Sequence, residues 1–386
     1  MNTLDLLNIV SRGETSTVQF KECLDSIDGI AAEMIAMANS SGGMILFGIV
    51  DKTGEIKGLT DEQIRDYNQK IGNIATDAIK PQLFVTTDII AVTATEGHPN
   101  NVLIVSIEEG IAKPYKDNQG RIWIKQGSDK RKLTDNNEQV RLFQQSGMIY
   151  LDEMKVPNTS IADINIEKVV NYLHMIDEDI EHTNEQDYKN INLLRDNNLT
   201  LGGLMFFAKN PQKNRPAFCV KAVSFYGNDI SGTEYRDRED IVGTIPEMFE
   251  KGMSFLLRNL RHTQQGQNFN STGILEISQV ALEELLQNAL THRDYSRNSP
   301  VLLFIFDDRV ELISPGRLPN SLTIDNIKMG NAVVRNPLIV SYSSKIMKYR
   351  GIGSGIRRAL KEQPDIVLTN DIENEQFKVV IPRSNL

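Results

Sequence analysis

Three polar side chains recur every four residues in the segment 283–296, which reads EELLQNALTHRDYS. On a helix, Glu284, Asn288 and His292 would share one face, so that an acid, an amide and an imidazole lie together. The other positions of this helix are mostly apolar. A polar stripe of this kind indicates either a binding site or a buried hydrogen-bonding network. Because Mg²⁺ prefers carboxylate and amide oxygens, Asn288 is a candidate metal ligand.

A glycine run, GIGSGI, begins at residue 351 and precedes a helix-like segment. Backbone N–H groups at the start of a helix can bind phosphate, so Gly351, Gly353 and Gly355 are candidate nucleotide-binding residues. The run does not fit the dinucleotide-binding fingerprint, because no ribose-binding acid follows a second strand at the expected distance. The alternative is a turn that binds no ligand.

Two acids and a lysine near the beginning of the chain form another candidate site. Glu14 and Asp51 lie beside strand-like segments and could converge on a divalent ion such as Mg²⁺ or Mn²⁺, while Lys21 could hold a phosphate oxygen. From spacing alone, scattered surface charges are the simpler interpretation. Gly42 and Gly43 permit a tight turn with close backbone approach, or simply end a helix.

A basic stretch between residues 113 and 132 has aromatic residues interleaved. Seven basic residues and two acids give it a local net charge of +5, on a chain whose net charge is −9. Positive charge together with rings such as Trp123, on which bases can stack, is typical of single-stranded nucleic-acid binding. A solvated hairpin with Trp123 in the core is the alternative. The basic residues are Lys113, Lys116, Arg121, Lys125, Lys130, Arg131 and Lys132.

The composition limits the class of protein. The chain has 386 residues, 40% of them hydrophobic, so two or three domains are expected. Its acidic net charge argues against a protein that coats nucleic acid with its whole surface. Cys23 and Cys219 support neither a disulfide framework nor a cysteine zinc site. Since no signal peptide is recognised and no apolar run approaches the roughly 20 residues that cross a bilayer, we expect a cytoplasmic protein without a membrane partner.

The order of strand-like and helix-like segments predicts an α/β (α+β) chain in three parts. Residues 1–148 would form a mixed sheet with few helices, 149–270 a helix-rich connecting region, and 271–386 a further mixture of strands and helices. Within these parts, the patterns predict a helix at 184–196 and a hairpin at 299–314.

The motifs GETSTVQFKE, MANSSGGMILFGIVDKTGEIKGL and RIWIKQGSDKRKL resemble the Schlafen AlbA-type domain, also called the divergent AAA domain and described as DNA-binding. In Schlafen nucleases, two glutamates five residues apart and a later aspartate hold a metal for RNA cleavage. Glu14 and Asp51 match the first and the last of these, whereas Gln19 replaces the second glutamate. The resemblance therefore implies nucleic-acid binding, and the lost charge argues against cleavage.

From LEELLQNALTHRDYS through PGRLP and VVRNPLI to GIGSGIRRAL, the chain resembles the GHKL ATPase-like region of bacterial proteins labelled transcriptional regulators or relatives of the RecG helicase C-terminus. The resemblance implies an α/β sandwich with ATP and Mg²⁺ as cofactors. It implies that Glu284 is the general base and Asn288 the Mg²⁺ ligand, and it adds Gly316 to the nucleotide-binding residues. Ser314 stands where the family has an adenine-binding aspartate.

These features lead to three functional hypotheses. The first is a DNA- or RNA-binding transcriptional regulator whose last part senses a nucleotide or is structural. The alternatives are a metal-dependent endoribonuclease that uses Glu14, Asp51 and Lys21, and a GHKL-type ATPase that uses Glu284. We expect a homodimer, because both resembled modules often act as dimers.

Overall fold

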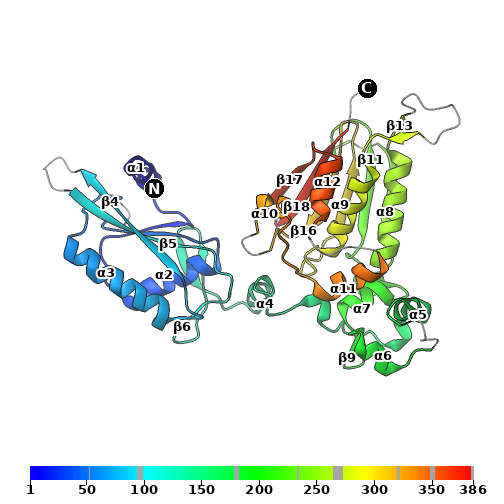
Figure 1. Ribbon diagram of the computed structural model, residues 1–386, viewed down its shortest axis with the longest axis horizontal. Coiled ribbons are helices and arrows are strands. Elements are labelled where there is room, and N and C mark those ends of the chain that lie inside the picture. The colour runs from blue at the N-terminus through cyan, green and yellow to red at the C-terminus, as the bar shows by residue number, and fades with distance from the viewer. Residues whose placement is uncertain are drawn as a thin grey trace. The chain divides into compact units, whose positions relative to one another are not determined.

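The computed structural model divides the chain into two compact units, Met1–Ile149 and Tyr150–Leu386 (Figure 1). Both units combine helices with mixed sheets, so the predicted α/β (α+β) class is confirmed. Among the described residues, none of the helices is long and apolar enough to cross a membrane. The structure describes residues 1–51, 53–93, 99–177, 182–232, 234–263, 273–319, 322–347 and 353–383.

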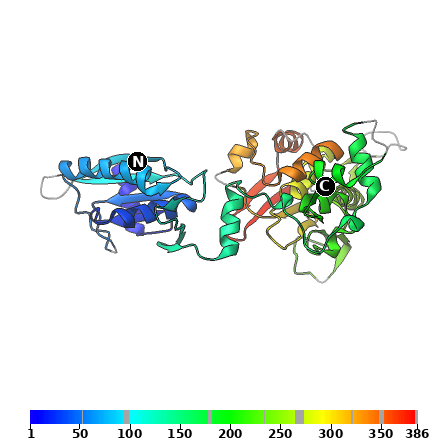
Figure 2. The same cartoon turned by 90° about the horizontal axis from the view of Figure 1, so that it is seen from below.

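The first unit is built on a four-stranded sheet in the order β1-β2-β5-β4, with β1 and β2 parallel and the other pairs antiparallel. Helix α1 packs on one face of the sheet, and α2 and α3 on the other (Figures 1 and 2). A short hairpin, β7-β8, packs against α2. The elements are α1 (Thr3–Arg12), β1 (Val18–Lys21), α2 (Ile27–Asn39), β2 (Gly43–Phe47), α3 (Asp61–Asn73), the π-helix η1 (Ile74–Ala78), β3 (Ile79–Lys80), β4 (Val85–Thr93), β5 (Pro99–Ile107), β6 (Lys116–Asp117), β7 (Trp123–Gln126), β8 (Asp129–Lys132) and α4 (Asn136–Gln145).

The side chains of β2 alternate between the two faces of this sheet. Ile45 and Phe47 pack with α2 and α3, whereas Leu46 packs with α1, as the two-residue period of a strand requires. The turn before β2 depends on glycine. Gly42 has a φ of 74°, and a Cβ there would lie 2.7 Å from the carbonyl oxygen of Ile107.

The second unit is built on a six-stranded sheet in the order β12-β11-β15-β16-β18-β17. Helices α8, α9 and α12 form a layer on one face (Figure 1). Strands β15 and β16 form the predicted hairpin at 299–314, which is therefore confirmed. The strands and longer helices are α5 (Ile166–His174), β9 (Leu194–Arg195), β10 (Asn198–Leu199), α7 (Leu201–Phe207), β11 (Val220–Phe225), β12 (Tyr235–Ile241), α8 (Ile245–Asn259), β13 (His262–Thr263), β14 (Ile274–Leu275), α9 (Gln279–Thr291), β15 (Val301–Ile305), β16 (Arg309–Pro315), α11 (Pro337–Ile346), α12 (Gly355–Glu362), β17 (Val367–Asp371) and β18 (Gln376–Pro382). The shorter helices are η2 (Leu151–Glu153), η3 (Ile161–Asp163), α6 (Glu185–Asn190), η4 (Pro211–Lys213) and α10 (Ile324–Lys328).

The second unit does not divide at the predicted boundary near residue 270. One hydrophobic core joins the two sides of that boundary, and in it the ring of Phe207 packs edge-on against Tyr342, with centroids 4.9 Å apart. Strand β11 of the predicted connecting region also pairs directly with β15. The connecting region thus completes the sheet and core of the last region.

The predicted helix at 184–196 is shorter in the structure. Helix α6 ends at Asn190, and the chain then forms the β9-β10 hairpin. Asp196 and Asn197 form its turn with φ values of 49° and 62°, a left-handed conformation that Asp and Asn tolerate better than most residues. The prediction was wrong beyond residue 190 because turn chemistry outweighed helical periodicity.

Candidate functional site

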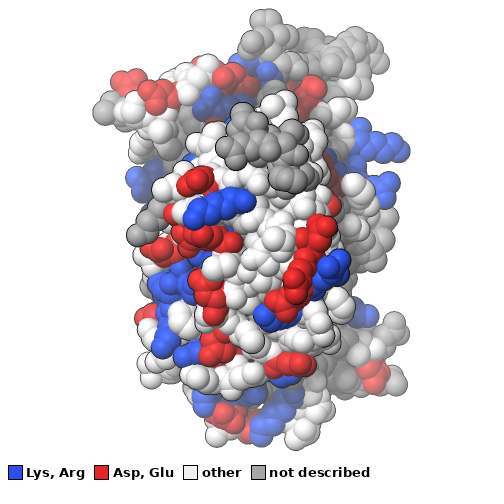
Figure 3. Space-filling model, turned by 90° about the vertical axis from the view of Figure 1, so that its left-hand side faces the viewer, with Lys and Arg blue, Asp and Glu red and all other residues white. Residues whose placement is uncertain are grey.

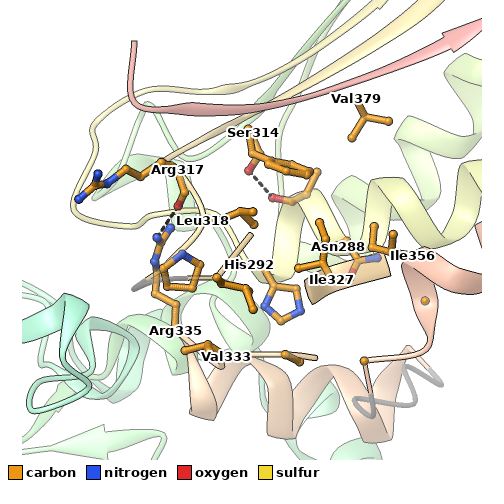
Figure 4. Close-up of a pocket in the computed structure, with 18 of the residues that line it drawn as sticks. Asn288, His292, Ser314, Arg317, Leu318, Ile327, Val333, Arg335, Ile356 and Val379 are labelled. Carbon is orange, nitrogen blue, oxygen red and sulfur yellow. Dashed lines mark hydrogen bonds between the residues drawn. The ribbon is translucent and has the colours of Figure 1, made fainter. Parts of the chain in front are cut away.

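The second unit contains an open cavity of about 130 Å³ beside α9 (Figure 4). Its walls come from α9, β16 and the loop after it, β18, the segment between α10 and α11, and the start of α12. Polar groups on these walls include an amide, an imidazole, a hydroxyl and the guanidinium group of Arg335. The apolar part of the lining includes Leu285, Leu312, Leu318, Ile327, Ile356 and Val379.

Four of the five predicted nucleotide-binding residues line this cavity: Asn288, Gly316, Gly353 and Gly355. The fifth, Gly351, lies outside the described residues. The residues meet because α12 packs against α9. The structure therefore brings the polar stripe and the glycine run into one site.

Two of these glycines have backbone conformations that a side chain would strain. The φ angle is 97° at Gly316 and 71° at Gly353. A Cβ at Gly316 would overlap the Cβ of Asp294, and a Cβ at Gly353 would overlap the carbonyl oxygen of Gly330. Close packing around these two positions therefore shapes the cavity wall.

Glu284 lies beside the cavity and contacts α12. One of its carboxylate oxygens forms an ion pair with Arg358. The other, Oε2, is buried without a hydrogen-bond partner among the described residues and lies against Gly355. The predicted general base is thus held by an arginine and joins two helices.

Ser314 lines the cavity at the position where the resemblance implies an aspartate. Its hydroxyl donates a 3.0 Å hydrogen bond to the carbonyl oxygen of Ala289 (Figure 4). Because the hydroxyl hydrogen is used in this bond, the oxygen can only accept a hydrogen bond from a ligand. The cavity therefore offers a neutral acceptor where the family has a charged one.

His292 follows α9, and its backbone N–H donates to the carbonyl oxygen of Asn288 at 2.9 Å. Burial, with a smaller effect of the nearby Arg335 charge, lowers the pKa of His292 to about 4. The imidazole is therefore neutral at pH 7. Arg335 also lines the cavity, and its Nη2 donates to the carbonyl oxygen of Arg317 at 2.7 Å. Arg317 and Arg335 were not predicted as site residues, although the motifs PGRLP and RNP, which contain them, were noted in the sequence.

The predicted acidic site of the first unit belongs to a network of buried polar side chains. The amide of Gln19 donates to Glu14 and accepts a 3.0 Å hydrogen bond from Nζ of Lys125. Lys125 binds one carboxylate oxygen of Glu33 at 2.6 Å, and Lys130 binds the other at 2.9 Å. Two carboxylates are thus balanced by two ammonium groups around a neutral amide. A divalent ion favours a site with excess negative charge, which this network does not have.

Asp51 forms an ion pair with Lys21. Glu14 accepts a second hydrogen bond, 2.9 Å long, from the backbone N–H of Phe20. Within the described part of the chain, no group of three or more His, Cys, Asp and Glu side chains is placed to hold a metal. Glu14 and Asp51 are therefore not prearranged as a Mg²⁺ or Mn²⁺ site among the described residues, and one oxygen of each carboxylate is bound by protein donors.

Most of the predicted nucleic-acid-binding residues pair with carboxylates of their own unit. Three acids outside the basic stretch join it in space and reduce its local net charge from +5 to +2. The side chains of Lys113 and Lys125 are 0% and 2% exposed, so neither can reach a nucleic acid, which corrects two of the seven predictions. On the face shown in Figure 3, acidic and basic side chains likewise lie interspersed. The pairs are Lys113–Glu109, Arg121–Asp117, Lys125–Glu33, Lys130–Glu33 and Arg131–Glu138.

Three of the cations contact aromatic rings. Nζ of Lys116 lies 5.9 Å from the ring centre of Phe143. Lys132 and Arg121 each lie 5.5 Å from the ring centre of Trp123. We call Lys116, Arg121, Lys132 and Trp123 the hairpin surface. It combines positive charge with an aromatic ring, which are the two elements of single-strand binding.

Two buried polar residues of α2 position the hairpin surface. Asn39 is 3% exposed, and its Nδ2 donates hydrogen bonds of 2.9 Å to the carbonyl oxygens of Tyr115 and Trp123. Glu33, 2% exposed, anchors the two lysines described above. Neither was predicted as a site residue, although a lone acid in the apolar run IAAEMIAMA is a signal that could have identified Glu33.

Two protein-family models match the chain. Residues 14–134 match the family described as "Schlafen, AlbA_2", and residues 298–381 match the family described as "Putative ATP-dependent DNA helicase recG C-terminal". No curated protein matches. Among solved structures, one similar chain is the DIP2311 protein from Corynebacterium diphtheriae, with 20% sequence identity and a TM-score of 0.47. The match covers 96% of this chain and 65% of that one, so the chain spans less than two thirds of that protein's length.

Proposed function

This chain carries a Schlafen AlbA_2-type domain and a RecG C-terminal-type domain, as its motifs predicted, and we propose that it is a nucleic-acid-binding regulator that senses a nucleotide. Both domain types are those of nucleic-acid-related proteins. The observation that carries the proposal is the presence in one chain of a basic, aromatic hairpin surface and a glycine-lined cavity.

The first unit would bind nucleic acid through the hairpin surface. A phosphate can bind Lys116 or Lys132 without breaking an ion pair, because neither lysine forms one with a described residue. Each contacts an aromatic ring instead. The five carboxylate-paired cations would have to lose a partner first, which costs free energy. We therefore assign phosphate binding to Lys116 and Lys132, and not to Arg121, which pairs with Asp117.

Fluorescence anisotropy with short single-stranded DNA and RNA tests this assignment. The Lys116→Ala/Lys132→Ala variant should bind more weakly, and its salt slope should decrease by about 1.4, because each single-strand phosphate contact contributes about 0.7. The control is Lys57→Ala/Lys70→Ala, which removes two half-exposed lysines of the same unit. Equal binding by the wild type and the Lys116→Ala/Lys132→Ala variant would exclude this surface.

The second unit would bind a nucleotide in the cavity. Ser314 can accept a hydrogen bond from a base amino group, and Asn288 lies beside the glycines at the start of α12. Apolar side chains such as Leu312 and Ile356 would pack against the ring. Thermal unfolding with adenine nucleotides tests this role, since a bound ligand raises the melting temperature of the second unit. Asn288→Ala should reduce that shift.

The residues present can accommodate Mg²⁺ together with a nucleotide. The buried Glu284 oxygen that has no donor among the described residues lies against Gly355, next to the amide of Asn288. Asn288 would hold the ion, which when bound would neutralise phosphate charge. ATP hydrolysis has less support than ATP binding, because Glu284 pairs with Arg358 and would have to leave it to accept a proton.

The endoribonuclease alternative is not favoured by the first unit. One oxygen of Glu14 and one of Asp51 are bound by donors of the protein, and Gln19 is neutral. We therefore expect no Mg²⁺- or Mn²⁺-dependent cleavage of structured RNA, measured on denaturing gels. Cleavage that disappears in Asp51→Ala would overturn this expectation.

Homodimer formation remains part of the proposal, and light scattering coupled to size-exclusion chromatography tests it.

A further inference from the structure

Arg335 is a cation on the cavity wall that has no carboxylate within ion-pair distance among the described residues. Among the described residues, its Nη2 donates a 2.7 Å hydrogen bond to the carbonyl oxygen of Arg317. Desolvation lowers the pKa of the Arg335 guanidinium, and the nearby negative charge of Asp294 opposes this effect. Because Asp294 does not come within ion-pair distance of Arg335, an anion in the cavity would give the guanidinium a direct charged partner.

The surroundings of Arg335 leave room for such an anion. Nη1 packs on Gly316, where a Cβ would lie 2.7 Å away and displace the guanidinium. Asp294, the nearest acid, uses Oδ1 to accept hydrogen bonds from the backbone N–H and hydroxyl of Ser296. The neighbouring His292 is neutral at pH 7 and adds no charge.

The position of Arg335 distinguishes its role from that of the glycine run. In Figure 4, Arg335 and Asn288 lie on opposite sides of His292, and the side chain of Arg317 extends away from both. Gly355 contacts Asn288, whereas Gly316 contacts Arg335. The cavity thus has a guanidinium at one end and an amide with Gly355 at the other, and apolar side chains also line it.

We propose that Arg335 binds the phosphate of a nucleoside monophosphate whose base packs among the apolar side chains of the cavity. A guanidinium pairs with phosphate oxygens through two parallel N–H donors, and Nη1 is available for this in addition to Nη2. This inference rests on the nucleotide-binding role proposed above. It concerns a monophosphate whose phosphate lies at the Arg335 end, which is the reverse of the orientation of a nucleotide whose phosphates meet Mg²⁺ at Asn288.

Isothermal titration calorimetry of the full chain with adenosine and with AMP tests this inference. Wild-type protein should bind AMP at least about ten-fold more tightly than adenosine, because only AMP offers the guanidinium a charged hydrogen-bond acceptor. Arg335→Gln should bind adenosine as the wild type does and lose most of the preference for AMP. Arg238→Gln, on strand β12 with a side chain 53% exposed, is the matched control and should keep the preference.

The outcomes separate this inference from the proposed function. If adenosine and AMP bind equally to the wild type, or if Arg335→Gln keeps the preference, Arg335 does not recognise the phosphate, but nucleotide binding stands. If neither ligand binds, both fail. If Arg335→Gln does not fold, phenylglyoxal labelling of the wild-type protein tests instead whether Arg335 recognises the phosphate. AMP but not adenosine should then protect Arg335 from modification, and equal labelling with both ligands would overturn the inference.

Discussion

The side-chain amide of Gln19 donates a hydrogen bond to the carboxylate of Glu14. Its carbonyl oxygen accepts one from Lys125, which in turn binds Glu33. The resembled nucleases have a second acid at this position, whereas this chain has a neutral group with one donor and one acceptor in use. The amide thus links β1 to α2 and the hairpin, and it keeps the network balanced in charge.

Gln19→Glu should make this network bind a divalent ion. The substitution removes the donor to Glu14 and places a second negative charge beside it, so the first unit should lose about 1–3 kcal/mol of stability at pH 7. Because the added charge favours a divalent ion, Mn²⁺ should raise the melting temperature of the variant more than that of the wild type. Gln19→Met, which removes the amide without adding charge, is the control. Equal Mn²⁺ shifts in all three proteins would refute this prediction.

Arg358→Ala should destabilise the second unit by about 2–4 kcal/mol, because it leaves the buried Glu284 carboxylate without a counter-charge. The same change in a Glu284→Gln background should cost much less. Urea unfolding of the wild type, the two single variants and the double variant measures the difference. Additive losses would show that the ion pair does not hold α12 on α9.

Asp152→Asn should make the second unit more stable at neutral pH relative to the wild type. The Asp152 side chain is fully buried, and its Oδ2 accepts a 2.9 Å hydrogen bond from the backbone N–H of Ile339 near the start of α11. Burial raises the pKa of Asp152 from 3.8 to about 7. Because the folded state then binds a proton that the unfolded state releases, the wild type loses stability as pH rises from about 4 to about 7.

The pH profile of stability distinguishes this variant from the wild type. Asp152→Asn keeps an acceptor for Ile339 and does not titrate, so its stability relative to the wild type should increase by on the order of 2–4 kcal/mol between pH 4 and pH 7. Thermal unfolding across this range measures the change. A difference between the two proteins that stays constant with pH would contradict it.

Ser314→Ala should weaken adenosine binding by about five-fold, since it removes one neutral hydrogen-bond acceptor worth about 1 kcal/mol. Ser314→Asp should restore or exceed wild-type affinity, because a charged acceptor is stronger. Titration calorimetry with adenosine measures both variants. Guanosine is the control ligand, since it presents a carbonyl where adenosine presents an amino group. Unchanged adenosine affinity in Ser314→Ala would place the base elsewhere in the cavity.

Local patterns predicted much of the fold. The hairpin at 299–314 has the apolar run VLLFIF before Asp307 and Asp308 and the strand-like segment RVELIS after them, and the structure has it as β15 and β16. The polar stripe predicted α9, and its residues lie beside the predicted glycines. The helix at 184–196 was wrong where Asp196 and Asn197 turn the chain, because their left-handed conformations do not appear in a hydrophobic pattern.

The sequence by itself determined the α/β class, the two resembled domains and the segments that line the cavity, because these follow from contiguous motifs and short periods. Only the tertiary structure decided which charged side chains are available to bind a ligand. Lys125 meets Gln19 across 106 positions of sequence and Glu33 across 92, so its burial could not be read from the basic stretch. Arg335 likewise became a candidate ligand-binding residue only when folding placed it on the cavity wall without a carboxylate partner among the described residues. Burial and pairing depend on contacts between distant segments, and local spacing does not specify those contacts.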